Sequence, residues 1–547
     1  MDDRYFIKPT EEQEELLKKT VELGMRFFDG SLRESKCLVY KDPRFFFKKL
    51  NEPIPIDPVE VEKSLDILKE IGKYSISQFD INFLSFPDSG NSLPGMMGAL
   101  FSKIINQNLM AFDRSAPIGT VIEVQLIEWL RQLMGYEYKS LEEMKNLHDV
   151  SGMSVTGGYM ANTVAVMAAL NNKFPEIKKK GLASLDVTPI ILVSKKISHY
   201  SIDAAAHHLG IGRDNVVDIP TKSDFTTDYT KLKEVLDSLP EDKVPFMVVG
   251  VAGNTKTANL DNMEEIADFC EKNDLWLHVD ACHGGSLLFS KKLKEKLMKG
   301  IERADSITID PHKGLFITYP SSFVLFKRRD TLIMFTRYPE KASDEKVWDL
   351  GLITPFYGSR GFESLSFWML IKIMGIKGIQ EAVEYRSDLA KYAERLIEET
   401  GMFVKLNEMD FYRLAFVYCP KDVHDWLKEN GEKLTKKQKE KITNLINEYD
   451  HRMNQKLYES GKLCLDEYGI HDVDNRASIH NMEDRLLAMA ITVGNPLYTE
   501  ESIKRALGML FKEAEKNIES FKNDFKKALI DKSVSTQYDI IKGPAGW

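Results

Sequence analysis

Between Leu275 and Lys313, two short apolar segments stand out from the more polar sequence around them, one opening LWLHVDACHGG and the other opening SITIDPHKG. Both are rich in β-branched residues and end at turn-forming residues, which predicts buried β-strands. The segment between them, SLLFSKKLKEKLMKGIERAD, is amphipathic and long enough for a crossover helix. The pattern therefore predicts a β–α–β unit in a parallel sheet. Polar residues stand at the carboxyl ends of its strands, where open α/β sheets place ligands.

Apolar strand-like segments and amphipathic helix-like segments also follow one another over much of the chain. A helical periodicity covers APIGTVIEVQLIEWLRQLMGYE, strand-like segments appear in PIILVS and VPFMVVGVAGN, and the small residues of SGMSVTGG immediately precede a helix. Past Leu389 the pattern changes to paired helices with two strands, FYRLAFVYC and LLAMAITVGNP. We predict an α/β protein with a mostly parallel sheet flanked by helices. The expected divisions are an N-terminal helical segment (1–78), a large domain (79–388) and a small C-terminal α+β domain (389–547).

Composition narrows the classes of function. The 547 residues carry a formal charge of −9, with a pI near 5.8, which argues against nucleic-acid binding. The sequence has no apolar run of membrane-spanning length and no signal-peptide core, so we expect a cytoplasmic protein without a membrane partner. Its five cysteines lie far apart without a CxxC motif, which predicts neither a disulfide framework nor a zinc ribbon.

Asp280 on one predicted buried strand and Lys313 just after the next strand are unusual residues for a core. An unpaired buried charge is costly, so something must compensate both. Pyridoxal 5′-phosphate (PLP) would do so. Its aldehyde condenses with a lysine amine to a Schiff base, and a carboxylate beside its pyridine nitrogen keeps that nitrogen protonated. The pair therefore indicates a PLP site with Lys313 as the cofactor's attachment point.

Two other interpretations of these residues remain open at this stage. His278, Asp280 and Cys282 alternate along one strand and would share a face, as metal ligands can. A metal site, however, gives Lys313 no role, and we predict none. In the other interpretation, Asp280 caps a loop at the strand end and Lys313 lies on the surface.

The motifs HVDACHGG and SITIDPHK together resemble those of the group II PLP-dependent amino-acid decarboxylases, from about Phe79 to about Leu497. This family includes glutamate, aromatic amino-acid, tyrosine and cysteine-sulfinate decarboxylases. The resemblance implies fold type I, the PLP-dependent transferase-like fold. It also implies that His199, in SHYS, stacks on the pyridoxal ring and that Cys282 lies against the opposite face. The family usually has alanine in place of Cys282, whereas lyase-like relatives also have cysteine.

The resemblance also suggests how the cofactor's other groups are held. Small residues before a helix, in SVTGGYM, leave backbone N–H groups free for a phosphate. The family places its phosphate there and at two residues of SITIDPHK, and it places a polar residue of AGNT near the phenolic oxygen. The residues assigned to these positions are Thr156, Gly157 and Gly158 in the first motif, Ser306 and His312 in the second, and Asn254 and Thr255 in the third. Asp310 stands where asparagine is common, and we expect it to point elsewhere or to be neutralised.

A charged loop follows, in which family members carry the tyrosine that protonates Cα after carbon dioxide leaves. Tyr338 matches best, with Tyr357 as the alternative, and a surface tyrosine without such a role is an equal possibility. The family's usual carboxylate-binding arginine of the C-terminal strand is replaced in the neighbourhood of Ala488 and Met489. This difference counts against glutamate as the substrate.

We therefore expect PLP-dependent α-decarboxylation of an L-amino acid to an amine and carbon dioxide, with Lys313, Asp280, His199 and Tyr338 as catalytic residues. A PLP-dependent carbon–carbon lyase or decarboxylating aldehyde synthase would use the same cofactor residues. A PLP-binding protein without catalysis is a further alternative, raised by the missing arginine. Family members are dimers with sites at the subunit interface, so the resemblance implies a homodimer.

Overall fold

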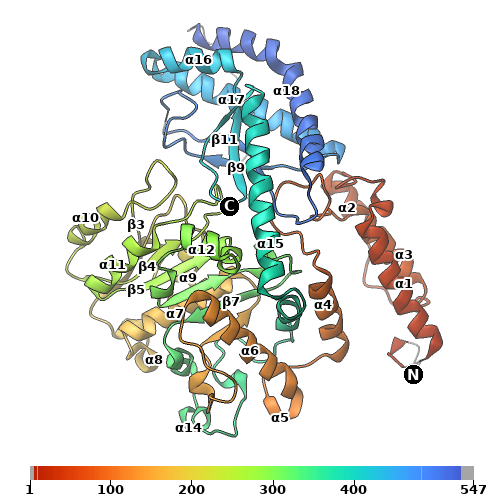
Figure 1. The fold of residues 1–547 in the computed structure, drawn as a ribbon, viewed down its shortest axis with the longest axis vertical. Coiled ribbons are helices and arrows are strands. Elements are labelled where there is room, and N and C mark those ends of the chain that lie inside the picture. The colour runs from red at the N-terminus through yellow and green to blue at the C-terminus, as the bar shows by residue number, and fades with distance from the viewer. Residues whose placement is uncertain (1–4, 9, 482, 531–547) are drawn as a thin grey trace.

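A seven-stranded sheet forms the centre of the large domain in the computed structural model, which describes residues 5–8, 10–481 and 483–530 (Figure 1). Its strands, in spatial order, are β1 (Gly152–Val155), β7 (Ser322–Phe326), β6 (Ser306–Ile309), β5 (Trp276–Ala281), β4 (Lys243–Val251), β2 (Thr188–Val193) and β3 (Val216–Asp218). The neighbours from β6 to β3 pair in parallel, whereas β7 is antiparallel to both β6 and β1. The predicted mostly parallel sheet is confirmed.

Helices cover both faces of this sheet and build the rest of the molecule. In the large domain and the segments before it they are α1 (Glu11–Phe28), α2 (Pro43–Lys49), α3 (Lys63–Tyr74), α4 (Leu93–Ile105), α5 (Phe112–Ser115), α6 (Pro117–Met134), α7 (Gly158–Lys173), α8 (Ile177–Lys180), α9 (Ser201–His208), α10 (Leu232–Asp237), α11 (Met263–Asn273), α12 (Lys291–Leu297), α13 (Pro311–Gly314) and α14 (Pro339–Ala342). Helix α6 starts at Pro117 and ends at Gly135, whose φ of 92° suits a glycine after a helix.

The predicted crossover between β5 and β6 is not one long helix. It consists of a 3₁₀ turn at Gly284–Phe289, the short helix α12 and a second 3₁₀ turn at Ile301–Arg303. The Ser290 side chain accepts a hydrogen bond from Leu293 N and caps α12, so the helix starts only there. Gly300, with φ 92°, begins the second turn. Amphipathic spacing alone did not reveal these two interruptions.

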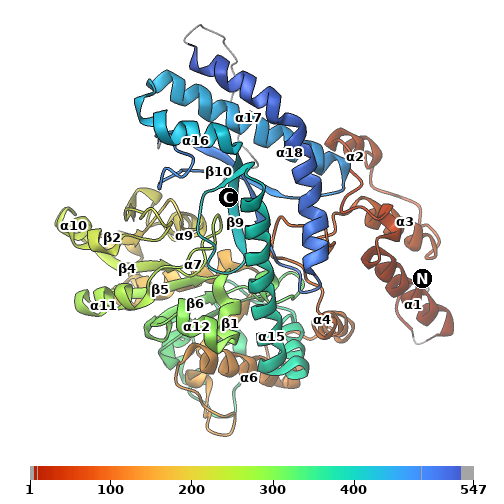
Figure 2. The ribbon, with the colours of Figure 1, turned by 45° about the horizontal axis from the view of Figure 1, so that its top comes forward.

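The small C-terminal domain has a four-stranded antiparallel sheet covered by long helices (Figure 2). Its strands, in spatial order, are β10 (Asp466–Ile470), β11 (Leu486–Thr492), β9 (Arg413–Tyr418) and β8 (Phe403–Lys405), and its helices are α16 (Lys421–Asn430), α17 (Lys436–Ser460) and α18 (Glu500–Leu529). Helix α15 (Ser364–Glu399) joins the domains and is broken at Gly375, where φ is 63° and ψ is 174°. The predicted boundary at residue 388 falls within this helix.

The N-terminal helices α1 to α3 form an arm that projects from the body (Figures 1 and 2). None of these helices contains a buried residue. The segment after the arm crosses to the C-terminal domain, because Leu84 N donates to Cys464 O and Thr492 N donates to Leu84 O. Helices α1 to α3 thus pack little of their own apolar surface within this chain.

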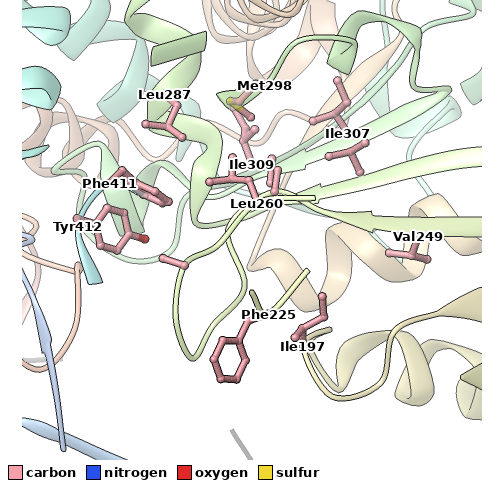
Figure 3. Packing of buried hydrophobic residues seen from close by; sticks show 14 of the residues in the cluster. Ile197, Phe225, Val249, Leu260, Leu287, Met298, Ile307, Ile309, Phe411 and Tyr412 are labelled. Atoms are coloured by element: carbon pink, nitrogen blue, oxygen red, sulfur yellow. The ribbon is translucent and has the colours of Figure 1, made fainter. Parts of the chain in front are cut away.

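One hydrophobic core runs through the large domain into the small one. Figure 3 shows part of it, where Ile309 of β6 lies near Leu287 and Met298, with Ile307 farther along the strand and Phe411 and Tyr412 on the other side. Strands β5 and β6 are buried along their whole length, which explains their continuous apolar sequence. In the described part of the chain, no helix has both the length and the apolar character needed to cross a membrane.

Candidate active site

A cavity of about 220 Å³ opens at the carboxyl ends of the strands of the large sheet. The residues that line it come from the segments after β1, β2, β4, β5, β6 and α13, which meet at this edge. The predicted site residues among them are Gly157, Gly158, His199, Asn254, Thr255, Asp280, Cys282, His312 and Lys313. Predicted site residues up to 156 positions apart in the sequence, from 157 to 313, therefore converge on one space.

Lys313 lies in α13, the single helical turn that follows β6. Its Nζ is 3.1 Å from Asp310 Oδ2, and Ser322 Oγ donates to Asp310 Oδ1 at 2.6 Å. Burial opposes the charge of each member of this pair. Nevertheless, Asp310 raises the pKa of Lys313 well above its ordinary value, and Lys313 and His312 lower the pKa of Asp310. The prediction that Asp310 is neutralised therefore corresponds to an ion pair with the lysine itself.

The turn that carries Lys313 is clamped from helix α15. Arg386 Nη1 donates to Gly314 O at 3.0 Å, and Nη2 donates to Ser286 Oγ at 3.2 Å. Its guanidinium also lies 5.1 Å from the centre of the Tyr412 ring. Arg386 is buried, and burial lowers its pKa to about 10. The helix that leads to the small domain thus fixes the backbone beside Lys313.

Asp280 stands near the end of β5, with both carboxylate oxygens hydrogen-bonded. Asn162 Nδ2 donates to Oδ2 at 2.8 Å, and Cys282 N donates to Oδ1 at 3.1 Å. Asn162 belongs to α7 and also donates to Ser201 Oγ at 2.9 Å. Hydrogen bonds of this kind stabilise the charged form of a carboxylate. Asn162 and Asp280 are 118 positions apart in the sequence, so no local motif indicates this contact.

In this structure, His278 is already engaged in hydrogen bonds and is not available as the metal ligand that the alternative interpretation needs. Both ring nitrogens of His278 are hydrogen-bonded, Nδ1 to Ser306 Oγ at 2.9 Å and Nε2 to Asn162 Oδ1 at 3.1 Å. In the described ranges, no group of three or more His, Cys, Asp or Glu side chains is arranged to hold a metal ion. His278 is therefore a partner of Asn162 rather than of an ion.

Helix α7 points its N-terminus at the cavity. A Cβ on Gly158 would lie 2.4 Å from Cys282 Sγ and 2.7 Å from Asp310 Oδ2, so only glycine permits this approach. A Cβ on Gly157, by contrast, would meet nothing within 4 Å, and φ is 148° there. No side chain caps the helix. Its first N–H groups therefore face open space, which is a favourable position for an anion.

His199 and Thr255 line the cavity from the segments after β2 and β4. Ser201 N donates to His199 Nδ1 at 3.3 Å, and burial lowers the pKa of the His199 ring. The Asn254 side chain bonds within its own loop, since Oδ1 accepts from Thr257 N at 2.7 Å and Nδ2 donates to Thr257 Oγ1 at 2.7 Å. Asn254 thus shapes the loop, and Thr255 is left as the better candidate for contact with a ligand.

Three predicted site residues do not line this cavity. The Thr156 N–H donates to Tyr357 Oη at 3.1 Å, and its hydroxyl lies 2.8 Å from the same oxygen. Ser306 lies at the opposite, amino end of β6, bonded to His278 and Trp276. Tyr338 precedes α14, and 49% of its surface is exposed. In this chain, therefore, Tyr357 contacts the α7 turn, whereas Tyr338 does not reach the cavity.

Sequence reasoning also missed a tyrosine and an acid at the cavity. Tyr319 lines it, and its hydroxyl donates to Asp88 Oδ2 at 2.5 Å. Burial raises the pKa of Asp88, whose Oδ1 is buried without a hydrogen-bond partner among the described residues. The two residues are 231 positions apart, and neither belongs to a local motif. No sequence signal pointed to their contact.

Comparison with known proteins shows which family has this fold and these motifs. The family model "Pyridoxal-dependent decarboxylase conserved domain" matches residues 43–419. The chain is 29% identical over 372 residues to "Acidic amino acid decarboxylase GADL1" of Homo sapiens, covering 66% of this chain and 68% of that protein. The crystal structure of mouse CSAD in apo form superposes with a TM-score of 0.79 at 23% identity, covering 92% and 99% of the two chains. The crystal structure of Oryza sativa TDC with PLP and tryptamine superposes with a TM-score of 0.78 at 19% identity, covering 93% of this chain and 99% of that chain.

The mixed sheet with its small antiparallel domain and the lysine at the strand ends define a PLP-dependent enzyme of fold type I. Within that class, the chain belongs to the pyridoxal-dependent decarboxylase family, whose model covers residues 43–419. It is a carboxy-lyase of the group II decarboxylases, with PLP as its cofactor. The predictions of the family, the fold class, the enzyme class and the cofactor are confirmed.

The residues present at the cavity fit this cofactor. Lys313 offers an amine, the hydrogen-bonded Asp280 offers a negative charge, and the uncapped start of α7 leaves space for a phosphate. Ser321, whose backbone oxygen bonds the His312 ring, has a buried side-chain oxygen without a hydrogen-bond partner among the described residues. Together these groups match the amine, ring and phosphate requirements of PLP.

Proposed function

We propose that this protein removes the α-carboxyl group of an L-amino acid as carbon dioxide and leaves the amine, with Lys313, Asp280, His199 and Tyr338 as catalytic residues. The observation that carries the proposal is the convergence of Lys313, Asp280 and His199 on one cavity beside the uncapped start of α7. When bound, PLP supplies an aldehyde for the amine and a ring that accepts the electrons of the broken bond.

Each residue has a separate task in this proposal. The Lys313 amine would hold the cofactor through its aldehyde and give up that place to the substrate amine, and Asp310 positions Nζ at 3.1 Å from its own Oδ2. Asp280 presents its charge to the ring nitrogen. His199, whose pKa is lowered by burial, covers the ring as a neutral group and excludes water. The N–H groups of Gly157 and Gly158, together with His312, take the phosphate.

A proton must reach Cα once carbon dioxide has left. Tyr338 remains the proposed donor, although it lies on an exposed segment outside the cavity lining, so the segment must close over the site. Tyr357 has a different role in this proposal, because its hydroxyl holds the Thr156 turn next to the phosphate position. Tyr338→Phe should reduce turnover on the order of 100-fold with cofactor affinity unchanged. Tyr357→Phe should weaken cofactor binding instead.

The central experiment uses the purified protein reconstituted with PLP. Each amino acid is tested for evolved carbon dioxide, and each product is identified by mass. We expect an amine in equal amount to carbon dioxide, no cofactor absorbance band from a lysine linkage in Lys313→Ala, and about 100-fold or greater loss of turnover in Asp280→Asn with cofactor retained. An aldehyde product would favour the lyase or aldehyde-synthase alternative, for which Cys282 is the suggestive residue. A normal band without any turnover would favour a non-catalytic protein.

For the substrate, a lysine offers a replacement for the missing arginine. Ala488 is buried and pairs with Tyr468, whose hydroxyl donates to Lys256 O, and Arg413 Nε donates to the same oxygen at 2.9 Å. Lys256 lines a small cavity that shares Ile197 and Asn254 with the main one. It has no ion pair among the described residues, and burial together with Arg485 lowers its pKa to about 8. We propose that it receives an anionic substrate side chain, in keeping with the name of the human relative.

Kinetics with paired substrates test this assignment. Lys256→Met should raise KM for acidic amino acids about tenfold, because one charge-assisted hydrogen bond is lost, and should leave KM for neutral amino acids unchanged. Lys256→Arg keeps the positive charge and should bring KM for acidic amino acids part of the way back to the wild-type value. Lys294→Met is the matched control, since Lys294 is also partly buried with a lowered pKa but bonds Leu133 O on the outside of the sheet. Equal changes in KM for both substrate classes would exclude the role.

We further propose a homodimer and a cytoplasmic location. Apolar side chains on α4 (Met97, Leu100, Phe101 and Ile104) are exposed, as are Leu17, Val21 and Met25 on α1. Contiguous exposed apolar surface of this kind marks an interaction site, and a second copy of the chain would cover it. The five cysteines are buried free thiols, which suits a reducing compartment.

A further inference from the structure

Four buried residues form a continuous chain of hydrogen bonds behind Asp280. Trp276 Nε1 donates to Ser306 Oγ at 2.8 Å, and Ser306 Oγ lies 2.9 Å from His278 Nδ1. His278 Nε2 lies 3.1 Å from Asn162 Oδ1, and Asn162 Nδ2 reaches Asp280 Oδ2 at 2.8 Å. The pairing of strands β5 and β6 positions these hydrogen-bonded residues, because His278 pairs with Ser306 and Asp280 pairs with Thr308.

The direction of every bond follows from its donors and acceptors. Asn162 uses its NH₂ group for Asp280 and Ser201, so its oxygen must accept from His278 Nε2. His278 then carries its proton on Nε2, and its bare Nδ1 must accept from the Ser306 hydroxyl. Ser306 in turn accepts from the Trp276 N–H, which can only donate. All four donors therefore point along the chain toward the Asp280 carboxylate.

Burial keeps His278 neutral, as this arrangement requires. The side chain is fully buried, and burial lowers its pKa to about 4. A neutral histidine adds no positive charge that would compete with a cationic ring for Asp280. Its role is limited to accepting from Ser306 and donating to Asn162.

We propose that His278 and Ser306 are positioning residues that fix the orientation of the Asn162 amide and thereby stabilise the negative charge of Asp280. This inference rests on the proposed role of Asp280 toward the cofactor's ring nitrogen. It also gives Ser306 a function other than phosphate binding. Aligned hydrogen bonds polarise one another in a low-dielectric interior, so a change at Ser306 is transmitted to Asp280.

Loss of the Ser306 hydroxyl would disturb the hydrogen bonds that lead to Asp280. Without a donor at Nδ1, His278 can hold its proton there and present a bare Nε2 to Asn162. In that tautomer two acceptors meet in either orientation of the amide: the bare Nε2 faces Asn162 Oδ1 as it stands, and turning the amide brings its oxygen against Asp280 instead. When the amide turns, the carboxylate loses a donor and gains a repulsive neighbour. Stabilisation of a protonated ring nitrogen weakens as a result.

The test measures the pH at which the bound cofactor's absorbance band titrates, together with turnover. Ser306→Ala should shift that titration about one pH unit lower and reduce turnover on the order of tenfold, since supporting residues of this kind typically contribute tenfold or more. Ser306→Thr keeps the hydroxyl and should restore both. Trp276→Phe, one bond farther away, should produce a smaller shift in the same direction.

A control and a double variant separate positioning from general destabilisation. Thr308→Val removes a buried hydroxyl from the same strand that has no hydrogen-bond partner among the described residues, and it should leave the titration unchanged. In an Asp280→Asn background, Ser306→Ala should add no further shift, because its effect passes through Asp280. Full additivity, or an unshifted titration in Ser306→Ala, would overturn the inference.

The two proposals fail in different ways. If Asp280→Asn leaves the absorbance titration and turnover of the reconstituted protein unchanged, the proposed function of Asp280 is wrong whatever Ser306→Ala does. If Asp280→Asn has its expected effect but Ser306→Ala matches the Thr308→Val control, only the positioning role is wrong.

Discussion

At the scale of single residues, the site is notable for a lysine that is ion-paired before any cofactor arrives. Asp310 stabilises the charged form of Lys313, whereas attachment of the cofactor needs the neutral amine. The same carboxylate lies beside Gly158 at the start of α7, where the phosphate is proposed to bind. Asp310 therefore opposes cofactor loading through both the amine and the phosphate.

Asp310→Asn tests this opposition. The amide keeps its hydrogen bond with Ser322 but no longer raises the pKa of Lys313, and each unit by which that pKa falls gives about tenfold more neutral amine at pH 7. Loading by PLP should become faster, and its rise with pH should occur at lower pH than in the wild type. The cofactor-free variant should lose about 1–3 kcal/mol of stability, because Lys313 has lost its buried partner. Stopped-flow absorbance and thermal melts measure the two effects, and slower loading would contradict the argument.

Among single residues, those in local motifs were predictable and those that act across the fold were not. Lys313, His199 and Gly158 follow strands, Asp280 lies near the end of one, and the structure brings all four to one cavity. Asn162, Asp88, Tyr319 and Arg386 contribute through partners 72 to 231 positions away, which no periodicity encodes. Ser306 belongs to a local motif, yet it lies at the amino end of its strand. The motif placed it in the right strand but at the wrong end for the phosphate.

At the scale of elements, the absence of a side chain at Gly158 lets helix α7 approach Cys282 and Asp310 closely, beside the proposed phosphate position. Gly158→Ala would place a methyl group 2.4 Å from Cys282 Sγ and 2.7 Å from Asp310 Oδ2, so the start of the helix must move. We expect about 1–3 kcal/mol of lost stability and at least tenfold weaker PLP binding, measured by titration of the cofactor-free protein.

The matched control for this prediction is Gly508→Ala in α18. An added Cβ there would meet nothing within 4 Å, and alanine favours a helix over glycine. Stability should stay the same or rise, and PLP affinity should not change. Similar losses in both variants would show that α7 has no special relation to the cofactor.

Most elements were predictable because burial on both faces leaves a clear sequence signature. Strands β5 and β6 and helix α6 match their predicted positions. The crossover at 286–305 differs because capping by Ser290 and the turn at Gly300 interrupt an otherwise continuous amphipathic pattern. The break at Gly375 in α15 was also missed, since its sequence remains apolar on both sides.

At the scale of the whole molecule, the arm and helix α4 leave a large apolar area uncovered in a single chain. Phe101 and Ile104 are 54% and 65% exposed on α4. If a second copy covers this area, sedimentation should give twice the chain mass of 62.6 kDa. The double variant Phe101→Asp and Ile104→Asp should shift the protein to the monomer, because each buried carboxylate would cost several kcal/mol.

A surface substitution elsewhere checks that charge alone is not responsible. Lys233 lies on α10, on the opposite side of the molecule from α4 (Figure 1), and its side chain is 78% exposed. Lys233→Asp should leave the sedimentation coefficient unchanged. A wild-type protein that sediments as a monomer at micromolar concentration would contradict the dimer proposal.

The contact between Arg386 and Gly314 has a consequence for how the protein denatures. The helix that bears Arg386 continues into the small domain, so melting of that domain withdraws the clamp from the turn that carries Lys313, the proposed attachment point of the cofactor. Prosthetic-group release and collapse of the C-terminal region thus become one cooperative event. Since a ligand confined to the native state stabilises that state by mass action, saturation with vitamin B6 phosphate should protect both regions from urea to the same extent.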